Sequence, residues 1–570
     1  MNRSQWSFLF ALPHWQWILA GWMLAGVLLV LAIPLNLGGH VERVARIFLN
    51  LNPRDLLGQG GLSFLVVLLV GGLIGAALYA LAAALAAWQP RPGQVPSGRW
   101  SWLRYALPML VVWTIYLLAF YPAMLSPDST HVWLQVQTGV FDNAHPLVYL
   151  VMVWLLTRLW NTPTIVAVAQ IVSLSLLAAW ALGLLRRRGL PEWAAWLVAL
   201  IFALAPGNGA MVVTLWKDIP YGMAMLAFSL LVLRISLDPR GMLAKRSTGL
   251  LLGLSAAMVG LLRYNGLVIA PLVFLALGII YRRQWRVFAA AMAVFVMGWW
   301  LVETPLDRAL EVKRTSAVSG SLAMHHIAAH LHYDTPVSEA DRATLERIMP
   351  LEEWRYYCYM ANPVLFNPAR DQQAMLDSLP DLNWVALRMA LENPTVDINQ
   401  AFCAGSIVYR VLQPYDGYLY GAAIAPDGTG GGTYVDPNTF GIVEAPVLPG
   451  LNRWLIHTFE RTRNGPFSWL IWRPAFYLYL FLFCGAVFAM RAHTWRAGLF
   501  LLPGAVHSAV LFAVSISQAF RYQYPIYLLA LFSLALLFLP CASAPAELME
   551  ARPSPAPLSP PDRPGRTSAA

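Results

Sequence analysis

Six charged residues stand at the ends of long apolar stretches of this chain. They are Asp128, Asp142, Lys217, Asp218, Arg263 and Arg521. A charge near the centre of a bilayer costs about 3 kcal/mol on insertion scales, so a charge beside a membrane segment usually marks a functional site or a water-filled cavity. One membrane topology puts all six residues on the same side. The sequence therefore predicts an anion-binding site assembled from distant parts of the chain.

Three of these residues are cations that we expect to open inward-running helices. They begin the segments Lys217-Asp218-Ile219-Pro220, Arg263-Tyr264-Asn265-Gly266 and Arg521-Tyr522-Gln523-Tyr524-Pro525. Helix N-termini favour a bound anion, and arginine presents a fork of donors that matches phosphate oxygens. The alternative is snorkelling, in which a long cationic side chain only reaches water or lipid headgroups. The expected phosphate-binding residues are Lys217, Arg263 and Arg521, supported by Asp218, Asn265 and Tyr522.

Two acidic residues follow the third apolar stretch. Asp128 lies in Tyr-Pro-Ala-Met-Leu-Ser-Pro-Asp-Ser, and Asp142 precedes His145 in Asp-Asn-Ala-His-Pro. A carboxylate beside cationic helix ends can take a proton from a hydroxyl nucleophile, so Asp128 and Asp142 are the candidate catalytic residues and His145 supports them. For Asp128 the alternative is capping, since Ser-Pro-Asp-Ser also starts helices. For Asp142 and His145 it is a loop that closes onto the next helix.

Metal binding stays open at this point. Asp142 with His145, and His326 with His330 one helical turn later, are the groups with ligand chemistry. No acidic partner completes a zinc signature at His326, and a satisfied surface helix explains that pair equally. We therefore assign no metal ligand and leave a divalent metal cofactor open. Phosphate loops and nucleophile turns are absent from the sequence, which disfavours soluble nucleotide-dependent chemistry.

The elements that must position these residues are membrane helices. The chain has 570 residues, 58% hydrophobic and 12% charged, against about 25% charged in soluble domains. Apolar runs of about 20 residues predict an all-α polytopic membrane protein with about twelve spans. We place them near 15–35, 62–88, 103–121, 163–185, 191–207, 211–233, 248–262, 265–281, 286–303, 468–490, 497–515 and 521–540.

Basic residues in the short loops set the orientation of these spans. The net charge of +10 is spread over loops rather than gathered on one face, which predicts no nucleic-acid partner. The loops expected in the cytoplasm carry Arg91, Arg99, Arg104, Arg186 to Arg188, Arg240, Lys245, Arg246, Arg282, Arg283, Arg286, Arg491 and Arg496. This orientation requires that the run from Pro146 to Trp160 does not cross the bilayer. We interpret it as an interfacial helix in the first large outer loop.

Five segments follow from this organisation. Residues 1–100 hold two N-terminal spans and a cytoplasmic loop, and 101–303 form the membrane core with the outer loop 122–162. Residues 304–467 form a small extracytoplasmic domain, in which Cys358 and Cys403 can pair in an oxidising compartment. Residues 468–541 add three spans. The tail 542–570 is rich in Pro, Ser and Ala and is expected to be disordered and cytoplasmic.

Between Trp102 and Phe538 the chain resembles the GT-C superfamily of integral-membrane glycosyltransferases, and family 39 in particular. The resemblance rests on the acid after a span in Tyr-Pro-Ala-Met-Leu-Ser-Pro-Asp-Ser, on His-Pro-Leu, on Trp-Lys-Asp, on Arg-Tyr-Asn-Gly and on the late Arg-Tyr-x-Tyr-Pro. It implies a polyprenyl-phosphate-sugar donor and an active site on the periplasmic face of a bacterial inner membrane, serving the cell envelope. Asp128 matches the base of that family. The chain has no Asp-Glu or Asp-x-Asp pair there, which leaves metal dependence and the role of Asp142 open.

The expected reaction is direct displacement with inversion at the anomeric carbon. A sugar phosphate leaves without an acid when its growing charge is stabilised, so one Asp base on the acceptor suffices, unlike the two carboxylates common in glycoside hydrolysis. The acceptor is a lipid, a polysaccharide or a protein. Two rival functions use the same residues: a transporter or flippase of lipid-linked sugars, and a non-catalytic scaffold for envelope assembly.

Overall fold

The computed structural model describes residues 15–32, 59–96, 98–314, 320–412, 442 and 444–541. Within these ranges the secondary structure is helical, apart from three isolated β-bridges. The predicted disordered tail 542–570 lies outside the described residues, as do the ends of some predicted loops. The described part of the chain is therefore all-helical, as the apolar runs predict.

Eight described helical segments are long and apolar enough to cross a bilayer. They are Leu62–Ala87 within α4 (Gln59–Ala87), Ser101–Ala119 (η2 with α5, Leu107–Ala119), α8 (Pro163–Arg186), α11 (Asp218–Leu237), Arg282–Ala309 (from η3 through α15, Trp285–Leu301, to α16, Asp307–Ala309), α26 (Pro474–Arg491), Trp495–Val514 (η6 with α27, Leu502–Val514) and Phe520–Phe538 (η7, α28, Tyr524–Ser533, and η8). Shorter apolar helices are α2 (Trp15–Ala32), α7 (Leu147–Leu159), α13 (Arg246–Leu262) and α14 (Gly266–Ile280). These long apolar helices indicate a multi-pass membrane protein. The predicted total of twelve spans remains a prediction.

Two predicted span boundaries are wrong for local reasons. Helix α9 (Glu192–Leu204) stops before Pro206, and α10 (Pro206–Val212) continues at 60° to it. Proline lacks the N–H that would continue the helix and favours an extended residue before it, and Ala205 has ψ 115°. The span predicted at 211–233 consequently begins only at Asp218. The span predicted to end at 303 runs on to Ala309 through a π-helical turn, Val302–Leu306.

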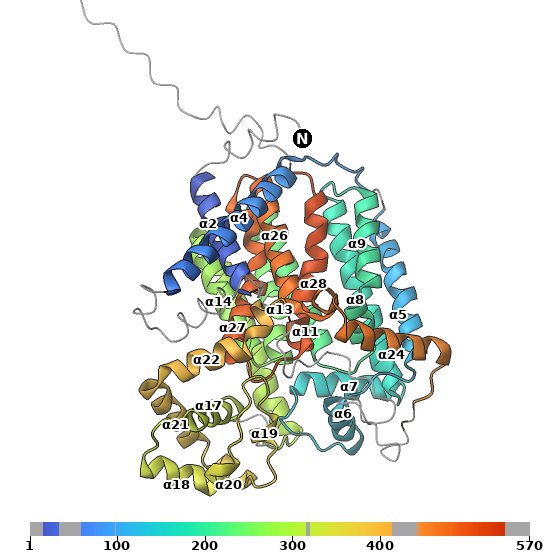
Figure 1. Cartoon of the computed structure of the whole chain (residues 1–570). Coiled ribbons are helices and arrows are strands. Elements are labelled where there is room, and N and C mark those ends of the chain that lie inside the picture. Colours follow the sequence, from blue (N-terminus) through green and yellow to red (C-terminus); the bar gives the residue numbers. More distant parts are fainter. Residues whose placement is uncertain are drawn as a thin grey trace, which may run out of the picture.

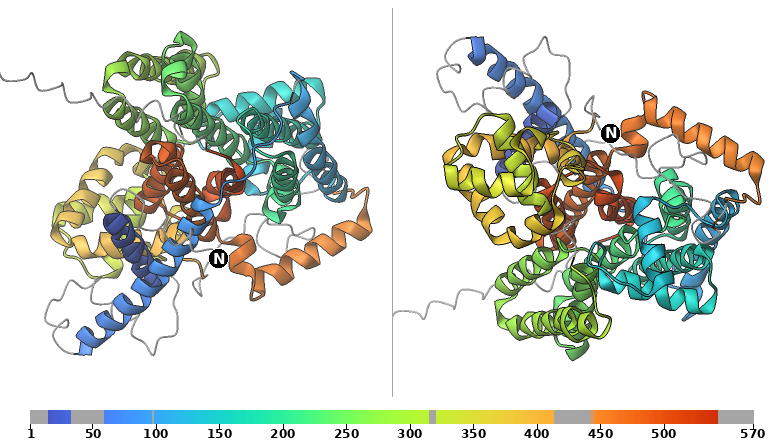
Figure 2. Two further views of the ribbon diagram at one scale, coloured as in Figure 1. Left: turned by 90° about the horizontal axis from the view of Figure 1, so that it is seen from above. Right: turned by 90° about the horizontal axis from the view of Figure 1, so that it is seen from below.

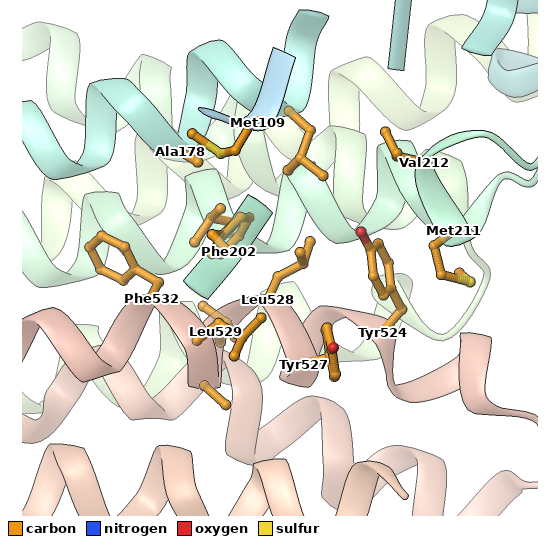
Figure 3. Close-up of a cluster of buried hydrophobic side chains, with 14 of the residues drawn as sticks. Met109, Ala178, Phe202, Met211, Val212, Tyr524, Tyr527, Leu528, Leu529 and Phe532 are labelled. Atoms are coloured by element: carbon orange, nitrogen blue, oxygen red, sulfur yellow. The ribbon is translucent and has the colours of Figure 1, made fainter. Parts of the chain in front are cut away.

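Helix α28 forms the centre of the membrane bundle. All ten of its residues are buried, and it packs against α11 and α26. Figure 2 shows it in the middle of the bundle from above and from below. Its side chains Leu528 and Phe532 pack with Met109 of α5 and Phe202 of α9 in one apolar cluster (Figure 3). The loop that leads into α28, which carries Arg521, is therefore held against the core.

A second group of helices gathers at one end of the bundle. Figure 1 shows α6 (Pro127–Thr138), α7 and α17 (Ser321–His332) at this end, with α7 and α24 (Pro449–Asn464) lying across the direction of α8. The remaining helices are α12 (Pro239–Leu243), α18 (Glu339–Ile348), α19 (Asn362–Leu365), α20 (Gln372–Asp377), α21 (Leu379–Glu392), α22 (Pro394–Ala404), α23 (Ser406–Tyr409) and α25 (Ser468–Trp472). Helix α7 has 13 residues, fewer than the roughly 20 that a span needs.

Helices α17 to α21 enclose a hydrophobic core of their own, which includes Met324, Leu345 and Leu382. A disulfide joins Cys358 to Cys403 across a sequence separation of 45 residues, so the sequence-based hypothesis of this pair is confirmed. Gln518, ahead of α28, donates from Nε2 to the carbonyl oxygen of Cys403 at 2.6 Å. This small helical unit is thus bonded directly to the segment that leads to Arg521.

Candidate functional site

The hydrogen bonds at the start of α6 leave the Asp128 side chain to a partner outside the helix. Ser126 is the N-cap, and its hydroxyl and that of Ser129 complete a capping box. Asp128 sits in the first turn with its side chain free of capping, and its Oδ2 lies 2.5 Å from Nη1 of Arg521. Ser-Pro-Asp-Ser thus starts a helix, as the alternative expects, but Ser126 rather than Asp128 is its cap. Two residues that are 393 positions apart in sequence form one ion pair.

Backbone pairing brings the segment before α11 to the same place. Met124 donates its N–H to Val213 O at 2.9 Å, and Leu215 donates to Met124 O at 3.1 Å. The hydroxyl of Ser129 donates to Leu215 O at 2.8 Å. These bonds fix the path of the chain from Val213 onward, so that Lys217 follows directly beside the start of α6.

A second ion pair joins the loops before α11 and α14. Nη1 of Arg263 lies 2.8 Å from Oδ1 of Asp218, whose side chain is fully buried. The Tyr522 ring contacts both arginines: its centroid is 4.6 Å from the Arg263 guanidinium carbon and 5.5 Å from that of Arg521. Such contacts are worth about 0.5–2 kcal/mol depending on desolvation. Tyr522 therefore makes a cation–π contact with each of the two arginines.

Lys217 and His145 form the third contact of the cluster. Nζ of Lys217 lies 3.2 Å from Nδ1 of His145, so a charged Lys217 donates to the ring nitrogen. Burial lowers the pKa of His145 to about 3, with the Lys217 charge adding to the effect. His145 is thus neutral at physiological pH and serves as an acceptor for the ammonium.

Asp142 is held in place by hydrogen bonds to its carboxylate and from its backbone N–H. Its Oδ1 accepts from Nε2 of Gln135 at 3.1 Å and from the Ala144 N–H at 2.9 Å, and its own N–H donates to Gln135 Oε1 at 2.8 Å. Its Oδ2 lies 3.0 Å from Nε2 of His131. The backbone on either side of Asp142 pairs with Lys313. Asp142 therefore orients His131, a role that sequence reasoning had left open.

The charges of the cluster change the proton affinity of its members. Burial acts to raise the pKa of Asp128, but the Arg521 and Lys217 charges outweigh it and hold the pKa well below its usual range. Burial lowers the pKa of Lys217, and the opposing pull of Asp128 and Asp218 is smaller. Lys217 also interacts with Arg521 and Arg263. Lys217 therefore lies within electrostatic range of both Arg521 and Arg263.

Most of the residues predicted from the sequence meet in this cluster. The contacts above link Asp128 with Arg521, Lys217 with His145, Asp218 with Arg263, and Tyr522 with both arginines. Asp142 joins them through His131, whose ring centroid lies 5.3 Å from that of His145. Asn265 stands at the start of α14, where its side chain makes no capping hydrogen bond. The segment from Arg263 to Gly266 does lead into α14, whose N-cap is Asn265, but Arg263 itself is the C-cap residue of α13 and has extended backbone. Its role comes from the ion pair with Asp218, not from a helix N-terminus.

Several residues of the cluster were missed. His131 and Gln135 follow Asp128 at spacings of three and seven, which puts all three on one face of a helix, so the sequence carried a signal for them. Tyr149 and His507 carried none. Tyr149 of α7 has a buried hydroxyl without a hydrogen-bond partner among the described residues, and His507 bonds to Tyr221 and to the Tyr522 carbonyl. Only the fold brings these two side chains to the site.

The histidine pair of α17 has an acidic partner after all. Nδ1 of His326 lies 2.5 Å from Oδ1 of Asp397, and Nε2 of His330 lies 3.0 Å from its Oδ2. The carboxylate is contributed by α22, out of reach of local sequence patterns. No group of three or more His, Cys, Asp or Glu side chains in the described residues is arranged to hold a metal ion. The trio instead fastens α17 to α22.

Asp397→Asn should weaken the contact between α17 and α22. Burial acts to raise the pKa of Asp397, but the two histidine hydrogen bonds outweigh it and lower the pKa to about 2. A lowered carboxyl pKa stabilises the fold above its ordinary value of about 4, and this stabilisation is lost as the pH falls toward 2. Because the group is partly exposed, we expect a loss of about 1 kcal/mol, or about fivefold faster amide exchange in α17 and α22 at pH 7.

Hydrogen exchange of the full chain measures this difference, with the exposed Asp377→Asn as control. The difference in melting temperature between Asp397→Asn and wild type should become smaller as the pH is lowered from 7 to 3. Equal exchange in the two variants would show that Asp397 does not fasten the helices.

Comparisons with known proteins test which family the chain belongs to. Neither protein-family models, nor curated proteins, nor solved structures match it. The resemblance drawn from the sequence motifs therefore stays an expectation. What the chain does has to be argued from its cluster of three cations, three carboxylates and the neutral His145.

Proposed function

We propose that this chain is a membrane glycosyltransferase that moves a sugar from a polyprenyl-phosphate donor to a lipid, polysaccharide or protein acceptor. The observation that supports this most is the meeting of Lys217, Arg263 and Arg521, from three distant segments, beside Asp128 and Asp218. Chance snorkelling would leave three such cations scattered around the bundle. Three cations in one cluster suit a phosphate.

The reaction needs little more than this cluster provides. The acceptor oxygen bonds to the anomeric carbon, the bond from that carbon to the phosphate oxygen breaks, and the phosphate departs with the electron pair. Positioned cations stabilise the charge that grows on the leaving phosphate. The acceptor proton goes to a base in the outer segment that carries Asp128 and Asp142. Displacement in one step inverts the anomeric carbon.

Two buried polar groups beside the cations suit a sugar. Oδ2 of Asp218, the carboxylate oxygen that is not paired with Arg263, lacks a hydrogen-bond partner among the described residues, and so does the Tyr149 hydroxyl. Buried polar atoms are nearly always hydrogen-bonded, so an exception calls for an explanation. Tyr149 interacts electrostatically with Asp218 and Asp128, which puts these groups in one neighbourhood. Sugar hydroxyls both donate and accept, so they would supply the missing hydrogen bonds of Asp218 and Tyr149.

The two ends of α11 have different surroundings. The cluster lies where α11 begins. Where α11 ends, a cavity of about 570 Å³ is lined by Arg240, Arg282, Arg283 and Arg496, so three of the loops predicted to be cytoplasmic meet there. We infer that the cluster faces the periplasm of a bacterial inner membrane, that α7 and α24 lie at that surface and that α17 to α23 form the extracytoplasmic domain. The twelve predicted spans belong to this proposal.

One observation favours the rival transport function. Helix α9 breaks at Pro206 by 60° and α10 leads toward Lys217, and broken helices line the substrate sites of many transporters. Transporters commonly pair such helices in two related halves, and the described residues contain one bent pair. A transporter would move the intact donor, whereas a transferase breaks it.

Lys217→Gln tests the transferase in nanodiscs with synthetic short-chain polyprenyl-phosphate sugars. We expect wild type to release polyprenyl phosphate, and kcat/KM to fall about 10- to 100-fold in the variant, the equivalent of about 1.5–3 kcal/mol for hydrogen bonds to a charged group. Lys245→Gln is the matched control, because Lys245 is an exposed lysine just ahead of α13. Release of polyprenyl phosphate is followed by thin-layer chromatography.

The rivals give different results in the same preparation. Transfer of intact labelled donor across vesicle membranes without release of polyprenyl phosphate would establish transport. Unchanged envelope function after separate substitution of Lys217, Arg263 and Arg521 would favour a scaffold.

A further inference from the structure

The proposed reaction needs a base, and Asp128 is poorly suited to be one. Its Oδ2 is held 2.5 Å from Nη1 of Arg521, and the charges of Arg521 and Lys217 depress its pKa. The efficiency of a general base falls as its pKa drops away from the working pH. Asp128 is therefore better suited to hold Arg521 in place than to accept a proton.

His131 has the placement that Asp128 lacks. It stands three residues after Asp128 on α6, its side chain is 39% exposed, and its Nε2 lies 3.0 Å from Oδ2 of Asp142. Gln135 and the Ala144 N–H fix that carboxylate from the other side. The Nδ1 atom has no hydrogen-bond partner among the described residues. One ring nitrogen is thus oriented by a carboxylate and the other is available.

The surroundings of His131 set its proton affinity. The hydrogen bond to Asp142 raises the pKa of His131; burial and the Lys217 charge act against it, and the Asp128 charge supports it. The His145 ring lies 5.3 Å away and is neutral, because burial lowers its pKa to about 3. Tyr264, on the loop before α14, also interacts electrostatically with Asp142. The net effect of these groups raises the pKa of His131, whereas the pKa of Asp128 is lowered, and the higher pKa makes His131 the better proton acceptor of the two.

We propose that Nδ1 of His131 accepts the acceptor's proton and that Asp142 is the positioning residue that orients the ring; this rests on the proposed transferase function. As the acceptor oxygen bonds to the anomeric carbon, its proton passes to Nδ1, and the sugar–phosphate bond breaks with its electron pair on the phosphate oxygen. The resulting imidazolium is stabilised by the Asp142 carboxylate, as in histidine–aspartate pairs of hydrolases. The proton then leaves to water.

His131→Ala, Asp142→Asn and Asp128→Asn in nanodiscs test the assignment. We expect His131→Ala to lower kcat on the order of 100-fold while native mass spectrometry still detects binding of a synthetic polyprenyl-phosphate sugar. Activity of wild type should fall on the acid side as His131 protonates, and Asp142→Asn should shift this limb to lower pH. Asp128→Asn should act mainly on KM. The matched control is His457→Ala, since His457 is an exposed histidine on α24.

A second readout does not depend on activity. Diethyl pyrocarbonate modifies neutral imidazole, so the pH dependence of His131 modification, followed by peptide mass spectrometry, reports its pKa. We expect Asp142→Asn to shift this dependence to lower pH. Normal kcat in His131→Ala with loss of kcat in Asp128→Asn would overturn the assignment and leave the transferase intact. Absence of donor binding and release in wild type would overturn the transferase, and the assignment with it.

Discussion

Arg521→Gln is expected to lower kcat/KM for the lipid-linked donor on the order of 10²- to 10³-fold, the range for removal of a group that stabilises transition-state charge. Two effects add in this variant. The leaving phosphate loses a cation, and Asp128 loses the guanidinium that lies 2.5 Å from its Oδ2. Only Nη1 of Arg521 is engaged by Asp128, and arginine has further N–H donors for a phosphate. Initial rates of polyprenyl phosphate release measure the loss.

Arg521→Lys separates charge from shape. Lysine keeps the positive charge but not the planar fork, so its rate should lie between those of wild type and Arg521→Gln. Asp128→Asn combined with Arg521→Gln should be less harmful than the sum of the two, with a coupling of about 0.5–3 kcal/mol. The exposed Arg342→Gln serves as control. A rate for Arg521→Gln within twofold of wild type would remove Arg521 from the site.

Arg263→Gln is expected to destabilise the folded protein by about 3–5 kcal/mol, because it leaves a buried charge unpaired. The Asp218 side chain is fully buried and that of Arg263 is 10% exposed, with the two charges 2.8 Å apart. The Tyr522 ring would also lose its closer cation. Denaturant unfolding in detergent micelles, followed by tryptophan fluorescence, measures the change.

The double variant Arg263→Gln/Asp218→Asn should recover much of this stability, since removing both partners of a buried pair leaves no charge unpaired. Arg246→Gln is the matched control, because Arg246 starts the same helix α13 and is exposed. If Arg263→Gln unfolds at the same denaturant concentration as Arg246→Gln, the ion pair does not stabilise the fold.

The helices could be predicted because their signal is local. An apolar run of the right length is visible without knowing its neighbours, and all twelve predicted runs are helical over most of their length. The errors fall where a single residue or turn interrupts the pattern, at Pro206 and at the π-turn after Leu301. Apolar residues flank Pro206 on both sides and hide the break, whereas the helix after Leu301 continues through the polar residues Glu303 and Thr304, where the apolar run has already ended. Hydropathy alone therefore cannot place either boundary.

The cluster could be predicted in its membership but not in its contacts. Asp128, Lys217, Arg263 and Arg521 stood out because charge is scarce beside apolar runs, and scarcity is a property of the sequence. His131 did not stand out, because a histidine on an amphipathic helix is ordinary until Asp142 is seen beside it. The partner of each charge depends on segments hundreds of residues away, such as Arg521 for Asp128.

By itself the sequence determined that this chain is helical and rich in membrane-crossing segments, and that its few charges stand at the ends of those segments. Hydrophobic burial follows from composition along the chain, so these properties need no tertiary information. Only the tertiary structure decided that Asp128 pairs with Arg521, that Asp218 pairs with Arg263 and that Asp142 orients His131. Electrostatic and hydrogen-bond energies depend on distances of a few ångströms, and only the packing of α6, α11, α13 and α28 sets those distances.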